Sequence, residues 1–283
     1  MTINCAGKLV SLENPKVMGI VNLTPDSFFQ PSRSPNPDDA VRAVANLLEA
    51  GATFLDLGAC STRPGASPVS SEQEISRLLP ALRAIVREFP SAVISVDTFR
   101  AEVALSAAGE GACMINDVSA GLLDPMMLET VAGLGVPFIM MHMRGTPQDM
   151  MDHTDYGNIV REMLLYFSRQ IATARDLGIS DLILDPGFGF SKTLEQNYEV
   201  MRRLSEFQIA ELPILVGVSR KSMVRAVTGT DASGALNATT ALHMAALMGG
   251  AKILRAHDVA QAVECVRIYE ALTRGDKVLR AES

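Results

Sequence analysis

The sequence predicts an α/β fold, a (β/α)8 TIM barrel with a short N-terminal β-hairpin. Two observations predict it: eight short apolar runs recur along the 283 residues, and longer segments of helical period separate them. A doubly wound sheet is less favoured, because no Gly-x-Gly-x-x-Gly stretch follows the first run. The runs are KVMGIVN (16–22), TFLDLG (53–58), AVISVD (92–97), ACMIND (112–117), PFIMMH (137–142), DLILD (181–185), PILVGVS (213–219) and AKILRAH (251–257).

The runs read as parallel strands, because several are apolar at successive positions, as strands covered on both faces are. One intervening helix is expected to open with a capping box formed by Ser71 and Glu74, and another to close at Gly178. Their apolar stripes are Ile75, Leu78, Leu79, Leu82, Ile85, Val86 and Phe89 in the first, and Ile159, Met163, Phe167, Ile171 and Ala174 in the second.

We expect residues 1–15 to form the hairpin and to close the bottom of the barrel. No composition shift marks a boundary, so residues 1–283 are interpreted as a single domain. Two segments, 24–39 and 61–71, are rich in Pro and Ser and lack helical period. Each follows a strand, which places it at the C-terminal mouth of the barrel, where long loops are commonly functional.

Composition narrows the classes of partner. With 25 Lys plus Arg against 32 Asp plus Glu, the formal charge of −7 argues against nucleic acid. No stretch has the length of a membrane span, and the first residues have no signal-peptide pattern, so we expect a cytoplasmic protein without membrane contact. Four scattered cysteines predict reduced thiols rather than a disulfide or zinc framework.

Polar residues end nearly every run, and the C-terminal ends of barrel strands converge on one rim. Asp97, Asn116 and Asp185 offer the donors and acceptors that a planar nitrogen heterocycle requires, and Lys221 adds a donor. Arg63, Arg255 and His257 suit an anion such as phosphate. The stretch VGVSRKS ends in two cations, Arg220 and Lys221, which we expect to face this ligand. Asp56 lies inside its run, where a structural role explains it equally well, and we leave it out of the site.

Several of these residues stand in stretches that resemble the dihydropteroate synthases of the pterin-binding enzyme family. Each match is short, but they occur in the family's order from residue 18 to residue 259. They are MGIVNLTPDSF (18–28), STRPGA (61–66), SVDT (95–98), INDVSAG (115–121), MHMRGTP (141–147), LDPGFGF (184–190), GVSRKS (217–222) and ILRAHDV (253–259).

The resemblance implies an alkyl transferase of folate biosynthesis. It would join para-aminobenzoate to 6-hydroxymethyl-7,8-dihydropterin diphosphate, giving 7,8-dihydropteroate and pyrophosphate by a dissociative, SN1-like step. It also implies Mg²⁺ as cofactor, held on the diphosphate by Asn22, and a homodimer formed through outer helices. Catalysis would rest on Lys221, Arg255, His257 and Arg63.

The resemblance also assigns the substrate-binding residues. Asp97, Asn116, Asp185 and Lys221 would hold the pterin ring in a slot lined by Met140, Phe190 and Gly217. The diphosphate would bind Arg63, Arg255 and His257, with Arg255 also stacking on the pterin. The aminobenzoate would meet Thr62, Pro64, Ser222 and Phe28.

Two other interpretations stay open. A methyltetrahydrofolate–corrinoid methyltransferase shares the pterin-holding Asp and Asn residues but has no need of the STRPG stretch or the R-x-H pair. A non-catalytic pterin-binding paralogue would fit the departures from the family pattern. These are Phe29-Gln30-Pro31-Ser32 in place of Ser-Asp-Gly-Gly, Ala59-Cys60 in place of Gly-Glu, and Ser191 in place of Gly.

Overall fold

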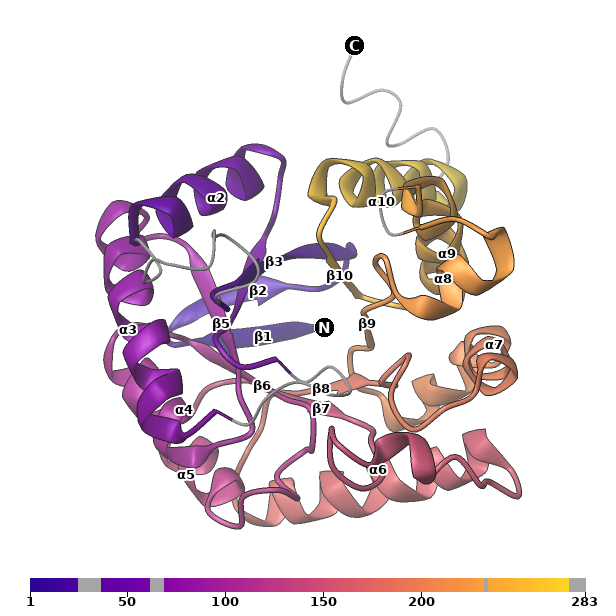
Figure 1. The fold of residues 1–283 in the computed structure, drawn as a ribbon, viewed down its shortest axis with the longest axis horizontal. Coiled ribbons are helices and arrows are strands. Elements are labelled where there is room, and N and C mark those ends of the chain that lie inside the picture. The colour runs from indigo at the N-terminus through magenta and orange to yellow at the C-terminus, as the bar shows by residue number, and fades with distance from the viewer. Residues whose placement is uncertain (25–36, 62–68, 232–233, 275–283) are drawn as a thin grey trace.

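The computed structural model describes residues 1–24, 37–61, 69–231 and 234–274. Its centre is an eight-stranded sheet in the order β8-β7-β6-β5-β4-β3-β10-β9, with every pair parallel. Figure 1 looks into the ring that these strands form. The strands are β3 (Lys16–Asn22), β4 (Phe54–Gly58), β5 (Val93–Asp97), β6 (Met114–Asp117), β7 (Phe138–Met141), β8 (Leu182–Asp185), β9 (Leu215–Val216) and β10 (Ile253–Ala256).

The two ends of the sheet meet and nearly close the barrel. A parallel bridge joins Leu184 of β8 to Ile214, just before β9. The barrel and all eight strand positions are therefore confirmed. Strand β9 is much shorter than the run 213–219, because the chain turns away after Gly217 and Arg220 takes a left-handed conformation with φ 57.

Helices surround the sheet on its outer side, as Figure 1 shows. The N-cap of helix α3 is Ser70, and Gln73 completes the capping box, so the prediction from Ser71 and Glu74 is wrong by one residue. Glu74 instead pairs with Arg100. The helices are α2 (Pro37–Glu49), α3 (Ser71–Glu88), α4 (Ala101–Gly109), α5 (Met127–Leu134), α6 (Ile159–Asp176), α7 (Leu194–Arg202), α8 (Ser222–Thr228), α9 (Leu236–Met248) and α10 (Val259–Arg274), with 3₁₀ turns η1 (Met150–Asp152) and η2 (Leu204–Ala210).

The N-terminal hairpin is present as expected. Strands β1 (Thr2–Cys5) and β2 (Lys8–Ser11) pair antiparallel. Their buried side chains pack against residues near the amino ends of the barrel strands and so close that end. Burial of one large apolar side chain such as Leu12 contributes ~1.5–3 kcal/mol. The cluster contains Ile3, Cys5, Val10, Leu12, Met18, Phe54, Val93, Cys113, Met114, Ile139, Ile183, Leu215 and Ile253.

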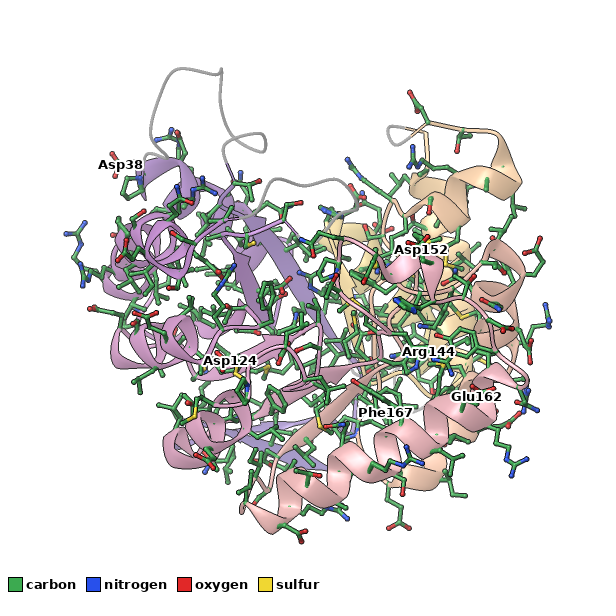
Figure 2. All side chains as sticks on the ribbon, turned by 60° about the horizontal axis from the view of Figure 1, so that its bottom comes forward. Asp38, Asp124, Arg144, Asp152, Glu162 and Phe167 are labelled. Atoms are coloured by element: carbon green, nitrogen blue, oxygen red, sulfur yellow. The ribbon has the colours of Figure 1, made fainter. Side chains whose placement is uncertain are left out.

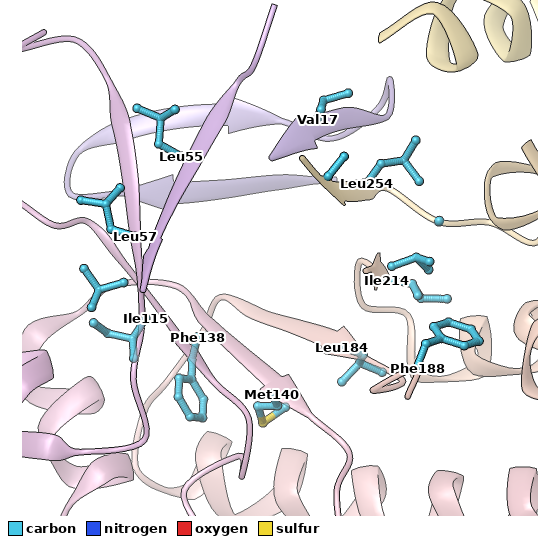
Figure 3. Packing of buried hydrophobic residues seen from close by; sticks show 14 of the residues in the cluster. Val17, Leu55, Leu57, Ile115, Phe138, Met140, Leu184, Phe188, Ile214 and Leu254 are labelled. Atoms are coloured by element: carbon cyan, nitrogen blue, oxygen red, sulfur yellow. The ribbon is translucent and has the colours of Figure 1, made fainter. Parts of the chain in front are cut away.

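A second, larger apolar cluster lies between the strands and the helices, and Figure 3 shows part of it. Because side chains alternate along a strand, the residues between these positions face the barrel interior. Phe138 of β7 packs on the helix side, for example, whereas Ile139 belongs to the interior cluster. Nearer the carboxyl ends, the inward positions become polar. Among the described residues, no helix is long and apolar enough to cross a membrane.

Candidate active site

The interior at the carboxyl ends of the strands holds a continuous polar network centred on Asp56. This side chain is fully buried, and its Oδ2 accepts hydrogen bonds from Arg255 Nε at 2.6 Å and from Asn116 Nδ2 at 2.9 Å. Arg255 Nη2 donates to Asp97 Oδ2 at 2.9 Å. Strands β4, β5, β6 and β10, far apart in sequence, are thus joined through side chains.

Sequence reasoning missed Asp56, and the structure corrects this. A signal was available, because a carboxylate inside an apolar run is almost never fully buried unless it is paired. In the pleat Asp56 lies two residues before Gly58, and Gly58 is the register neighbour of Asp97. The two carboxylates therefore face the same interior at adjacent levels.

Burial dominates the electrostatics of the acids that face this interior. It raises the pKa of Asp97, and the nearby Arg255 opposes the rise. Burial also raises the pKa of Asp185, opposed first by Lys221. Both carboxyls are therefore sensitive to any cation that enters or leaves the site.

Lys221 reaches the same interior from the turn before α8. Its Nζ donates to the Phe188 carbonyl at 2.5 Å and lies 4.9 Å from the centre of the Phe190 ring. Burial lowers its pKa to about 8, opposed by Asp185 and Asp97. The ammonium is thus a partly desolvated donor, and such a donor discriminates strongly between ligands that accept from it and ligands that do not.

The loop after β8 is folded back tightly on the end of β7. Asp185 Oδ1 accepts from the Gly187 amide at 2.8 Å. Gly187 has φ 67, and a Cβ there would lie 2.2 Å from the His142 carbonyl oxygen, so only glycine fits. Among the described residues, Asp185 Oδ2 and Asn116 Oδ1 have no hydrogen-bond partner. Both remain as acceptors for a ligand.

The predicted anion site is only partly described. The His257 ring places Nδ1 3.1 Å from Ser219 Oγ, and its backbone amide donates to the same oxygen at 3.2 Å. The expectation is wrong for Arg220, because its guanidinium donates to Asp258 at 2.9 and 2.5 Å and does not face the ring of acids. Ser222 is exposed at the first residue of α8.

Two residues were predicted to line the slot together with Phe190. Gly217 does lie on the inner side, where an added Cβ would be 3.8 Å from Arg255 Cβ. The prediction is wrong for Met140, which is the register neighbour of Leu184 and packs with it on the helix side. Met141, the neighbour of Asp185, takes the inward position. The error is one residue in a pattern that alternates at every residue.

Asn22 ends β3 beside Gly58 and is half-buried, and its side-chain amide has no hydrogen-bond partner among the described residues. No group of three or more His, Cys, Asp or Glu in the described part of the chain could hold a metal ion. The remaining predicted residues, Phe28, Thr62, Arg63 and Pro64, lie outside the described residues.

The described side chains form one site rather than several surfaces. Asp97, Asn116, Asp185, Lys221 and Arg255 face a common interior at the mouth of the barrel. It combines the cationic donors of Lys221 and Arg255 with carboxylate and amide acceptors. A flat ring bearing both N–H groups and a carbonyl is the ligand that such a set satisfies.

Comparison with known proteins agrees with this geometry. The family described as pterin binding enzyme matches residues 18–257. A dihydropteroate synthase of Escherichia coli K12 is 42% identical over 273 residues, which cover 96% of this chain and 96% of that protein.

Solved structures give the same result. A Yersinia pestis dihydropteroate synthase in complex with a sulfonamide drug superposes with a TM-score of 0.92 and 39% identity, covering 97% of this chain and 100% of that chain. A Xanthomonas albilineans dihydropteroate synthase with 4-aminobenzoic acid gives a TM-score of 0.89 and 37% identity, covering 96% and 97%.

Proposed function

The chain belongs to the dihydropteroate synthases of the pterin-binding enzyme family, and we propose that it is a transferase that joins para-aminobenzoate to 6-hydroxymethyl-7,8-dihydropterin diphosphate. The products are 7,8-dihydropteroate and pyrophosphate. The observation that carries the proposal is the convergence of Asp56, Asp97, Asn116 and Arg255 through side-chain hydrogen bonds, with Asp185 and Lys221 beside them.

The pterin ring would lie among these groups. Asn116 Oδ1 and Asp185 Oδ2 would accept from the amidine-like N–H groups of the ring, and Lys221 would donate to its carbonyl or ring nitrogen. Arg255, held by Asp56 and Asp97, would present its guanidinium to the ring face and to the diphosphate. Each of these groups is desolvated, so a ligand that leaves one unpaired is penalised by ~1–3 kcal/mol.

The reaction we propose is dissociative. The bond between the methylene carbon and the diphosphate oxygen breaks, and the electron pair leaves with pyrophosphate. The carbon left behind is a cation that delocalises into the dihydropterin ring. The aminobenzoate nitrogen then attacks this carbon and loses a proton. Catalysis would be electrostatic, with buried carboxylates near the developing cation and Arg255 and His257 near the departing anion; the family resemblance adds Arg63 to the anion site.

Asn22 fits a magnesium ion that is carried on the diphosphate. Mg²⁺ prefers oxygen ligands and commonly combines one or two protein ligands with substrate phosphates and water. The carboxamide of Asn22 at the mouth, which has no partner in the part of the chain that the structure describes, offers one such oxygen. When bound, Mg²⁺ supplies positive charge to the diphosphate oxygens. Replacing Asn22 by alanine should raise the Mg²⁺ concentration for half-maximal activity by about tenfold, ~1.4 kcal/mol for one ligand. An unchanged magnesium titration would remove Asn22 as a ligand.

Assembly and location are parts of the same proposal. A homodimer through outer helices is supported by the exposed apolar side chains Met248 of α9 and Ile268 and Leu272 of α10, which are 64%, 54% and 68% exposed. Sedimentation velocity measures the mass directly. A cytoplasmic location is supported by the four cysteines, each of them a free thiol.

One assay separates this function from its two rivals. The purified chain with Mg²⁺ and the dihydropterin diphosphate should release pyrophosphate only when para-aminobenzoate is added. Tight pterin binding without release would instead identify a non-catalytic paralogue. Methyl transfer from methyltetrahydrofolate to a corrinoid, with no pyrophosphate release, would identify the methyltransferase.

A further inference from the structure

A second lysine lies buried within the loop that follows β8, outside the set of residues placed against the substrates. Lys192 is 2% exposed. Its Nζ donates to the carbonyl oxygens of Gly187 and Phe190, both at 3.0 Å, and lies 3.1 Å from His142 Nδ1. An ammonium has three N–H donors, and here each has one acceptor.

His142 must be neutral for this arrangement. Burial, then Lys192 and Arg144, lower its pKa well below the usual range. The neutral ring carries its proton on Nε2 and leaves Nδ1 as the acceptor for Lys192. Burial also lowers the pKa of Lys192 to about 7, opposed by Asp185. Keeping a cation here is costly, and costly buried charges concentrate at functional sites.

Residues 187–190, which Lys192 holds through two carbonyls, are also the residues that Lys221 contacts. The Phe188 carbonyl accepts from Lys221 at 2.5 Å, and the Phe190 ring lies under the same ammonium. A Cβ added at Gly189 would lie 3.4 Å from Lys221 Cδ, so loop and side chain are in close contact. The two carbonyls bound by Lys192, those of Gly187 and Phe190, lie at the two ends of this four-residue segment.

We propose that Lys192 is a positioning residue for the dihydropterin site: it fixes the loop 187–190 and thereby places the ammonium of Lys221 and the ring of Phe190. The proposal rests on the function proposed above. It deepens that function by adding a residue that touches neither substrate.

Lys192 also acts through its charge. Several ionisable groups face it: His142 from the end of β7, Arg144 from the loop after β7, Asp185 from β8, and Lys221 from the turn before α8. It is one of the cations that oppose the rise in the pKa of Asp185. Without it the Asp185 carboxyl takes up a proton at higher pH, and a protonated Asp185 accepts less well from the pterin. The acid limb of kcat/KM should therefore move to higher pH.

The test compares Lys192→Met, which keeps the length but removes charge and donors, with Lys192→Arg, which keeps both. Lys252→Met is the matched control, because Lys252 precedes β10 at the opposite end of the barrel and donates to the Glu13 carbonyl at 3.4 Å. Steady-state kinetics are measured from pH 5.5 to 9, and the Kd of 6-hydroxymethyl-7,8-dihydropterin is measured by calorimetry.

We expect Lys192→Met to raise both KM for the dihydropterin diphosphate and the Kd of the pterin by about tenfold, the equivalent of ~1.4 kcal/mol. The acid limb of the kcat/KM profile should shift to higher pH. Lys192→Arg and Lys252→Met should keep KM, Kd and the acid limb close to those of the parent. A Lys192→Met variant with parental KM, Kd and acid limb overturns the proposal. A Lys192→Met variant with lower kcat and lower melting temperature but parental KM and Kd also overturns it, because a lysine with only a structural role gives that pattern.

The two proposals fail separately. If the parent chain binds the pterin but releases no pyrophosphate, the proposed function is wrong, and the Kd ratio of Lys192→Met to parent still decides the role of Lys192. If the parent turns over and the Kd ratio is one, only the role of Lys192 is wrong.

Discussion

Replacing Asp56 by asparagine changes one buried oxygen to nitrogen at the centre of the site. In the parent, one carboxylate oxygen accepts from Arg255 at 2.6 Å and from Asn116 at 2.9 Å. The amide of the variant retains one acceptor oxygen of similar size but no charge. Arg255 then keeps only the carboxylate of Asp97 as an ionic partner.

The magnitude follows from these contacts. A hydrogen bond to a charged group contributes ~1.5–3 kcal/mol, and the variant loses the equivalent of one. Since each 1.36 kcal/mol is a factor of ten in rate, kcat/KM should fall by about 10- to 100-fold if Arg255 must be held in place for turnover. Asp56→Ala, which removes the oxygen that accepts both hydrogen bonds and leaves Arg255 partly uncompensated, should also destabilise the fold by ~3–5 kcal/mol.

The assay is pyrophosphate release with both substrates, together with urea unfolding of each variant. Asp181→Asn is the matched control, because Asp181 precedes β8 at the bottom of the barrel, where it accepts from the Asn4 amide at 2.9 Å. Asp181→Asn should turn over like the parent. If Asp56→Asn also turned over like the parent, the network would be structural, and the reasoning that makes Arg255 depend on it would be refuted.

Two further predictions concern other buried ionisable groups. Lys221→Ala should lower pterin affinity and kcat/KM together, by at least about 100-fold, because it removes a desolvated donor; normal catalytic efficiency in a steady-state assay would refute its placement. His243 is buried, neither ring nitrogen has a hydrogen-bond partner among the described residues, and burial lowers its pKa from 6.5 to about 4. The unfolded ring therefore binds a proton below pH 6.5 while the folded ring does not, so stability should fall by up to ~3 kcal/mol between pH 6.5 and 4. His243→Met should flatten this slope, which urea unfolding at pH 5 and pH 8 measures. If the free energy of unfolding of the variant differed from that of the parent by the same amount at both pH values, the assignment would be contradicted.

The fold could be predicted because its signals are repeated along the chain. Eight apolar runs give eight strands, and each predicted run overlaps its strand. The run 213–219 forms a strand only at Leu215–Val216. The chain then enters a turn in which Arg220 has a left-handed backbone, and the apolar content of the run does not reveal this turn.

The site was predictable where a polar residue ends a run and less so elsewhere. Asp97, Asn116, Asp185 and Arg255 were found by position alone. The resemblance places Met140 in the slot, but side-chain direction alternates along a strand, and β7 turns Met141 rather than Met140 inward.

Other misses depend on tertiary contacts. Arg220 and its neighbour Lys221 are both cations in the same stretch, but the Arg220 guanidinium donates to Asp258, 38 residues away. Lys192 carries no motif of its own. Only the folded loop shows that its ammonium is surrounded by the carbonyls of Gly187 and Phe190.

The N-terminal hairpin has a consequence for how the molecule is made. Its two strands are synthesised before the barrel strands, yet the Asn4 amide donates to Asp181, Lys8 donates to the Ser91 carbonyl, and the hairpin's apolar side chains pack with Ile253 of β10. The hairpin therefore reaches its final contacts only after the strands from β3 to β10 have been synthesised. Until then the apolar side chains of the hairpin stay exposed. In nascent chains, residues 2–11 should consequently be protected from proteases only after β10 has emerged from the ribosome.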